Sequence, residues 1–104
     1  MAQIKWANSA YEDLEGIGRF IALESTLQAD RVIADIVDTP KMLIDYPEIG
    51  RIVPELSRKH IRELIYGNYR IIYFLNKDIA NIIAIHHSAR KFIKKDVIKR
   101  TKKI

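Results

Sequence analysis

A group of arginine and histidine residues in the second half of the chain has the side-chain types needed to act on a phosphate. Its members are Arg62, Arg70, His86, His87 and Arg90. Positioned arginines can hold a phosphate, and histidine can move a proton because its ordinary pKa lies near neutrality. Together, such residues could support the cleavage of RNA by attack of its own 2′-hydroxyl.

A structural role is the alternative for the same residues. Arg70 can simply pair with Glu63, and a histidine at the end of a strand is more often packed and hydrogen-bonded than catalytic. We expect no metal site, because the chain has no cysteine and the adjacent His86 and His87 point to opposite faces of a strand. The sequence also lacks a glycine-rich phosphate loop and a nucleophile-elbow serine, so we expect no cofactor.

Three predicted β-strands from Ile61 onward position this group. The turn Gly67-Asn68 separates IRELIY from YRIIYFL, and Asn76-Lys77-Asp78 separates the latter from IANIIAIHH. Alternation predicts a core face with Leu64, Tyr66, Ile71, Tyr73 and Leu75. The other face carries Ile61, Glu63, Ile65, Arg70, Ile72 and Phe74, and we expect it to be open to a partner or substrate. Either His86 or His87 could share that face, although the aliphatic residues Ile83 and Ile85 favour a core-facing His87.

The first half of the chain predicts a short strand and two helices. Residues 3–6 alternate polar and apolar side chains, and Ser9 with Glu12 forms a capping box at the start of a helix. Ser25 with Gln28 forms a second box, so two helices follow one another as an antiparallel hairpin. Pro40 predicts a kink or break near Thr39. The expected fold is α+β with the order βααβββ, in which a helical hairpin covers one face of an antiparallel sheet.

Length and charge favour one basic domain with a macromolecular partner. The 104 residues suit a single domain, 1–104, whose last residues, 91–104, form a basic C-terminal segment. Residues 1–56 carry a net charge of −5 and residues 57–104 a net charge of +10. The basic half is expected to face a polyanion or an acidic protein, although a lysine-rich tail can also be merely solvated. The absence of cysteine, of an apolar leader and of a membrane-spanning segment favours a cytoplasmic protein without a membrane partner.

Four stretches resemble the ParE/RelE superfamily of toxins from type II toxin–antitoxin modules. They are WANSAYEDLEGIGRFI (6–21), YPEIGRIVPEL (46–56), RELIYGNYRIIY (62–73) and IHHSAR (85–90), in the family's order and spacing. The combination is most similar to the ParE branch, also described as plasmid stabilisation proteins. The resemblance implies the βααβββ fold, growth arrest by the free toxin, and a hetero-oligomer with a small, acidic cognate antitoxin that wraps the toxin.

The two branches of this superfamily imply different targets. ParE-like toxins poison DNA gyrase, which is a binding function, whereas RelE-like toxins cleave mRNA on the ribosome. For cleavage, the resemblance assigns the catalytic positions to Arg70, His87 and Arg90. No tyrosine follows Tyr73, so the tyrosine that many RelE-like toxins use has no counterpart.

We therefore predict a gyrase-inhibiting toxin. The alternatives are a ribosome-dependent mRNA endoribonuclease and an inactive homologue that only binds an antitoxin. Contacts to target or antitoxin are expected at Arg62, Arg70, His86, His87, Arg90, Lys91, Phe92, Lys94 and Lys95.

Overall fold

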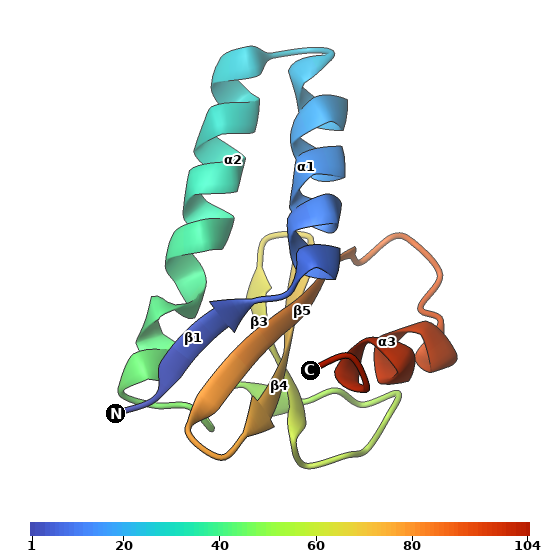
Figure 1. Cartoon of the computed structure of the whole chain (residues 1–104). Coiled ribbons are helices and arrows are strands. Elements are labelled where there is room, and N and C mark those ends of the chain that lie inside the picture. The colour runs from blue at the N-terminus through green and yellow to red at the C-terminus, as the bar shows by residue number, and fades with distance from the viewer.

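The computed structural model describes all 104 residues and contains one mixed sheet with helices on both faces (Figure 1). The elements are β1 (Gln3–Trp6), α1 (Asn8–Ala22), α2 (Thr26–Asp38), the 3₁₀ helix η1 (Thr39–Ile44), β2 (Arg51–Ile52), β3 (Ile61–Tyr66), β4 (Tyr69–Asn76), β5 (Ile79–His87) and α3 (Lys94–Thr101). The strand order is β1-β5-β4-β3-β2. The predicted α+β class is confirmed. The four strands from β2 to β5 are antiparallel, and β1 joins them by pairing parallel with β5.

The helical hairpin of α1 and α2 forms as predicted, but only one of its two capping boxes does. Ser25 accepts a hydrogen bond from the backbone N–H of Gln28 and caps α2. The predicted box at Ser9 is wrong, because the N-cap of α1 is Ala7, two residues earlier, and the Ser9 hydroxyl donates to the carbonyl oxygen of Ile83 on β5. Pro40 ends the α-helix as expected, since α2 stops at Asp38 and η1 continues the chain.

Both predicted turns of the sheet are two-residue connections. Gly67 adopts a φ of +54°, which a residue without Cβ does at little cost, and Tyr66 pairs with Tyr69. In the second turn Asn76 pairs with Ile79, and Lys77 takes the positive φ. None of the helices combines the length and the apolar character needed to cross a bilayer.

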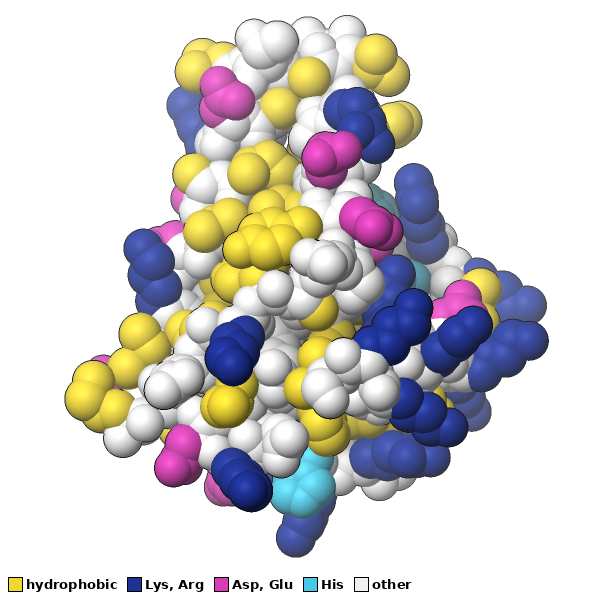
Figure 2. Space-filling view, viewed as in Figure 1, with side chains coloured by type: hydrophobic (Ala, Val, Ile, Leu, Met, Phe, Trp, Pro, Cys, Tyr) yellow, Lys and Arg dark blue, Asp and Glu magenta, His cyan; other side chains and the backbone are white.

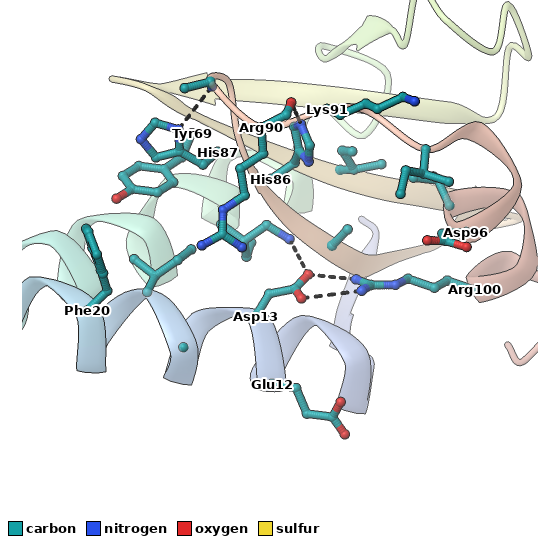
Figure 3. Close-up of a pocket in the computed structure, with 18 residues that line it drawn as sticks. Glu12, Asp13, Phe20, Tyr69, His86, His87, Arg90, Lys91, Asp96 and Arg100 are labelled. Atoms are coloured by element: carbon teal, nitrogen blue, oxygen red, sulfur yellow. Dashed lines mark hydrogen bonds and ion pairs between the residues drawn. The ribbon is translucent and has the colours of Figure 1, made fainter.

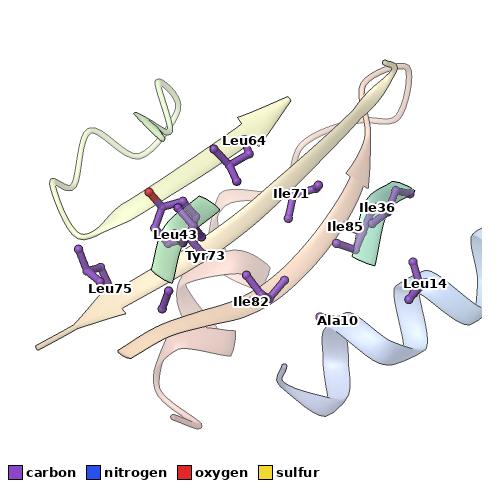
Figure 4. Packing of buried hydrophobic residues seen from close by; sticks show 11 residues of the cluster. Ala10, Leu14, Ile36, Leu43, Leu64, Ile71, Tyr73, Leu75, Ile82 and Ile85 are labelled. Carbon is purple, nitrogen blue, oxygen red and sulfur yellow. The ribbon is translucent and has the colours of Figure 1, made fainter. Parts of the chain in front are cut away.

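The face of the sheet toward the hairpin holds the larger core (Figure 4). Its 11 buried residues are Ala10, Leu14, Ile36, Leu43, Leu64, Ile71, Tyr73, Leu75, Ala80, Ile82 and Ile85. This confirms the predicted core face of β3 and β4. The Tyr73 side chain lies in this core, and its hydroxyl donates to the Pro47 carbonyl oxygen and accepts from the Gly50 N–H. Gly50 is required there, because a Cβ would lie 2.7 Å from the Tyr73 hydroxyl.

The opposite face of the sheet is covered, which corrects the expectation that it is open. Its buried apolar residues are Val53, Ile61, Ile72, Ile83, Ala84 and Val97. They lie beneath the loop that follows β2 and beneath α3, which Figure 1 shows beside the sheet and away from the helical hairpin. The amphipathic α3 contributes Val97 to this second core. The C-terminal segment is therefore part of the folded structure and is not simply a solvated tail.

Candidate functional site

A groove of about 660 Å³ lies between α1 and the segment that links β5 to α3 (Figure 3). Ile17 and Phe20 form an apolar wall on α1, and Phe20 is 70% exposed. Ile93 and Val97 line the other side. The end of β5 forms the floor, so the groove joins an apolar helix face to the basic half of the chain.

The edge of β5 beside the groove is capped by side chains. Strand β1 pairs with β5 only as far as Ile82, and no strand pairs with this edge farther along. Asp13 accepts a hydrogen bond from the Ile85 N–H at 3.0 Å, and Arg100 donates to the Ile83 carbonyl oxygen at 2.9 Å. Asp13 and Arg100 also form an ion pair at 2.6 Å. This pair ties α3 to α1 across the edge of the sheet.

Arg90 and Lys91 are the unpaired basic side chains of the groove, and Glu12 and Asp96 are its unpaired acidic ones. The side chains of Arg90 and Lys91 are both exposed. Figure 3 shows Arg90 reaching from the loop after β5 toward α1. Lys94 and Lys95 are exposed in the first turn of α3. Figure 2 shows a gathering of lysine and arginine side chains over the C-terminal segment. Four of the predicted contact residues, Arg90, Lys91, Lys94 and Lys95, are thus exposed side chains.

The two histidines face opposite sides of β5. His86 lies directly opposite Arg70 on β4, so it is the histidine that shares the arginine's face. His87 lies opposite Tyr69, and the two rings meet edge to face at 5.1 Å between centroids. A β-bulge shifts the register beside Ile72 and Tyr73, and Ile83 and Ile85 consequently belong to different cores. The expectation that Ile83 and Ile85 share a face is therefore wrong, and of these two residues only Ile85 lies on the side of His87.

Both histidine rings hold the turn that follows β5. The His86 Nε2 atom lies 3.0 Å from the Arg90 carbonyl oxygen, to which it can donate. The Ala89 N–H donates to His87 Nδ1 at 3.0 Å. Each ring therefore has a hydrogen bond that shapes the loop, as the structural alternative for these residues expected.

Arg70 is nearly buried and fully engaged by carboxylates. Its Nε donates to Glu63 at 2.6 Å, and its two terminal nitrogens donate to the two oxygens of Glu55 at 2.7 and 2.6 Å. The Phe92 ring covers the guanidinium at 4.8 Å from its centroid. Only 11% of the Arg70 side chain is exposed. The expectation that Arg70 lies on a face open to a partner or substrate is therefore wrong, because Glu55, Glu63 and Phe92 cover it.

The protonation of this cluster is fixed near neutral pH. The hydrogen bonds from Arg70 lower the pKa of Glu55 to about 2, and those from Glu55 raise the pKa of Arg70. Glu55 is consequently ionised and Arg70 is protonated over the physiological range. Neither residue can exchange a proton with a substrate in that range.

Two other predicted contact residues have structural partners. Arg62 donates to the backbone carbonyl oxygens of Gly50, Lys59 and Glu48, and so holds the segments on both sides of β2. Phe92 is half-buried, and its ring also meets that of His86 edge to face at 5.4 Å. The structure thus separates the predicted residues into an exposed cationic set and a set that holds loops to the sheet.

Sequence reasoning missed the partners that lie far away along the chain. Glu55 precedes Arg70 by 15 residues, and Asp13 precedes Arg100 by 87 residues. Glu55 is in a loop without periodicity, so no pattern indicated its orientation. For Phe20, the one signal available in the sequence was an apolar residue outside the core-facing stripe of an amphipathic helix.

Comparison with known proteins is decisive at the level of family. The family model described as "ParE toxin of type II toxin-antitoxin system, parDE" matches residues 4–92. The chain belongs to the ParE toxin family. This confirms the predicted superfamily and establishes the chain as a toxin of a type II toxin–antitoxin system, for which an antitoxin partner is implied.

This ParE-family toxin is also similar to two known proteins. The chain is 34% identical over 91 residues to Toxin RelE2 of Caulobacter vibrioides (strain ATCC 19089 / CIP 103742 / CB 15), an alignment covering 86% of this chain and 99% of that toxin. The structure of the present chain is similar to a chain described as "Chromosomal ParDE TA system from P. aeruginosa", with a TM-score of 0.70 and 22% sequence identity. That match covers 84% of this chain and 96% of the other and supports the fold.

Proposed function

We propose that this ParE-family toxin arrests growth by binding and inhibiting DNA gyrase, and that it does not cleave RNA. The observation that carries this proposal is the state of Arg70, whose guanidinium is held by Glu55 and Glu63 and is nearly withdrawn from solvent. A phosphate-holding arginine would need free donors aimed at the substrate. Inhibition by binding needs no such group.

The surroundings of Arg70 support the same proposal. His86 and His87 face opposite sides of β5 and are both used by the following turn. No tyrosine follows Tyr73 in the chain. A general acid and a general base must reach one substrate together with the group that holds the phosphate. His86 and His87 both line the groove, but Arg70 does not.

We further propose that the groove between α1 and the segment linking β5 to α3 is where the antitoxin binds. Phe20 and Ile17 offer an apolar wall, and Arg90 and Lys91 offer unpaired charge on the other side. An acidic segment with apolar side chains on one face complements both walls. The complex is a hetero-oligomer in the cytoplasm, where the toxin also meets its target.

An assay with purified gyrase and plasmid tests the proposed target. We expect the toxin to reduce supercoiling or to accumulate the cleaved gyrase–DNA complex, and we expect Arg90→Ala with Lys91→Ala to weaken the effect. The matched control is Lys102→Ala with Lys103→Ala, which removes the same charge from the exposed C-terminus. Unchanged supercoiling and no cleaved complex at toxin excess would reject gyrase inhibition.

RNA cleavage is the second candidate, because the toxin RelE2 is a relative at 34% identity and the groove carries Arg90 and His87. Translation on purified ribosomes with a defined mRNA tests it. We expect intact transcripts with the wild-type toxin. Cleavage that disappears in His87→Ala with Arg90→Ala, at an unchanged melting temperature, would establish this second activity.

An inactive homologue that only binds an antitoxin is the remaining alternative. Expression of the toxin without its antitoxin distinguishes the inactive homologue from the gyrase inhibitor and from the ribonuclease. We expect growth arrest that co-expression of the antitoxin relieves. Normal growth with the folded protein present would favour the inactive homologue.

A further inference from the structure

The two adjacent histidines at the end of β5 hold the following loop by hydrogen bonds of opposite direction. The Nε2 atom of His86 lies 3.0 Å from the carbonyl oxygen of Arg90. A carbonyl oxygen can only accept, so this nitrogen carries a proton and donates. The Nδ1 atom of His87 lies 3.0 Å from the backbone nitrogen of Ala89. A backbone N–H can only donate, so Nδ1 of His87 carries no proton and accepts.

Protonation therefore acts differently on the two contacts. A histidine that gains a proton becomes a donor at both ring nitrogens. His86 keeps its hydrogen bond, because its Nε2 remains a donor. Protonated His87 has an N–H at Nδ1 that faces the N–H of Ala89, and two donors form no hydrogen bond. The His87 ring must then turn away, and its bond to the loop is lost.

The loop that depends on this bond carries the unpaired basic side chains of the groove. Two backbone bonds also hold the turn, from the Ser88 N–H to the Asn68 carbonyl oxygen and from the Arg90 N–H to the His87 carbonyl oxygen. Residues 91–93 have no regular structure. Arg90 reaches from this loop toward α1 (Figure 3). Loss of the His87 bond therefore loosens the segment that places Arg90 and Lys91 on the groove.

The surroundings of His87 leave the contact with Ala89 as the one that protonation changes. The ring meets Tyr69 edge to face, its one hydrogen bond is that with Ala89, and no ion pair holds it. The charged side chains on the elements around it are Glu12 and Asp13 on α1, Asp96 and Arg100 on α3, and Arg90 and Lys91 on the loop itself.

We propose that His87 is a pH-dependent switch that regulates binding of the antitoxin at the groove. Neutral His87 holds the loop closed, with Arg90 directed toward α1. Protonated His87 releases the loop, and the groove loses its ordered cation. His87 is a positioning residue, because it acts through the loop. This inference rests on the proposed antitoxin site, and it does not depend on gyrase being the target.

An NMR titration of the full-length toxin from about pH 8 to about pH 5 tests the switch, because histidine changes charge in this range. The ¹⁵N shift of His87 Nδ1 reports protonation, and the backbone N–H signals of Ala89 and Arg90 report the loop. We expect the Ala89 N–H to lose its hydrogen-bonded shift and its protection from exchange as the ring gains its proton. A ring that titrates while the Ala89 N–H keeps its shift would overturn the proposal.

Three variants decide which histidine is responsible. In His87→Asn the side-chain oxygen can accept from an N–H two residues on and gains no proton, so the loop should stay closed throughout. His86→Gln keeps a donor for the Arg90 carbonyl oxygen and should behave as wild type. His60→Asn, which removes an exposed histidine before β3, should do the same. Equal loop opening in His87→Asn and wild type, or its loss in His86→Gln, would assign the effect to another group and overturn the proposal.

Calorimetry with the cognate antitoxin tests the consequence for the groove. The charge that His87 gains would itself attract an acidic partner, and about 0.3 M salt screens this attraction. Under these conditions we expect the affinity of the wild-type toxin to fall at least about threefold from about pH 7.5 to about pH 5.5, because the closed loop becomes the minor state. His87→Asn should show a smaller fall.

Two outcomes separate this inference from the proposed antitoxin site. An affinity that is the same in wild type and in Arg90→Ala with Lys91→Ala would reject the groove as that site. An affinity that depends on these two side chains but falls with pH equally in His87→Asn and wild type would leave the site in place and reject its regulation by His87.

Discussion

The two faces of the same strands are closed by different kinds of interaction. On β4, Ile71 faces the helical hairpin and Ile72 faces α3, and both are fully buried. The hairpin face is closed by apolar side chains at helical spacing. The α3 face combines a smaller apolar cluster with the carboxylates and arginines around Arg70.

The difference shows how a small domain of this kind can cover both faces of its sheet. Apolar contacts are non-directional, so two regular helices are enough to bury the hairpin face. Hydrogen-bonded ion pairs need defined geometry, and on the α3 face they fasten a loop and a short helix that offer little apolar surface. On the α3 face, removal of one charge should therefore loosen the loop and the helix that cover the sheet. On the hairpin face, loss of side-chain volume should have the largest effect on stability.

The largest expected effect comes from truncation in the two cores. Ile71→Ala should lower the free energy of unfolding by about 4 kcal/mol, and Ile72→Ala by about 2 to 3 kcal/mol, because a loop can relax into a cavity better than two packed helices can. Urea denaturation of both variants measures the difference. A greater loss for Ile72→Ala would refute this ranking of the faces.

The next effect should come from breaking the buried ion pairs. Arg70→Met leaves the Glu63 carboxylate buried with Arg51 as its one remaining cationic partner, and should cost about 3 kcal/mol. The control is Arg51→Met, whose side chain is 58% exposed, and it should cost about 1 kcal/mol or less. Similar losses in the two variants would mean that the Arg70 pair contributes no more than a surface pair.

Acid should weaken the α3 face through Glu55. The unfolded chain takes up a proton there near the ordinary value of 4.5, whereas in the folded protein Arg70 holds the pKa of Glu55 at about 2. The unfolded state therefore binds more protons between these values, and the free energy of unfolding falls as the pH is lowered through them, by at most about 1.4 kcal/mol per pH unit.

Comparison with Glu55→Gln isolates this contribution from that of the other carboxylates. Chemical denaturation between pH 5 and pH 2 should give a shallower pH dependence for the variant than for wild type. Identical slopes would show that the contact contributes nothing in solution.

The smallest effect is expected at the cap on the β5 edge. Asp13→Asn keeps an oxygen for the Ile85 N–H but removes the charge that holds Arg100, so it should cost about 1 kcal/mol and speed hydrogen exchange in α3. Glu15→Gln on the same helix removes an exposed pair with Arg19 and serves as the control. Unchanged exchange in α3 for Asp13→Asn would show that the pair does not anchor that helix.

Local sequence patterns were sufficient for most of the fold. Alternation in residues 61–75 correctly separated Leu64, Ile71 and Tyr73 from Glu63 and Ile72, and Gly67-Asn68 fixed their register. Pro40 and Ser25 marked the ends of α2. These signals are short in range, because each depends on the steric and hydrogen-bonding preferences of a few neighbouring residues.

The amino-acid sequence by itself determined the βααβββ succession that β1, α1, α2, β3, β4 and β5 form, the composition of the two faces of β3 and β4, and the basic character of the C-terminal half; β2 and α3 were not predicted. Only the tertiary structure decided that α3 covers the second face, that Glu55 neutralises Arg70, and that Ser9 and Asp13 are used at the β5 edge. The physical reason is that a charge or a hydroxyl takes its role from whichever partner the folded chain brings within hydrogen-bonding distance. Those partners come from segments whose approach is set by the packing of the whole molecule.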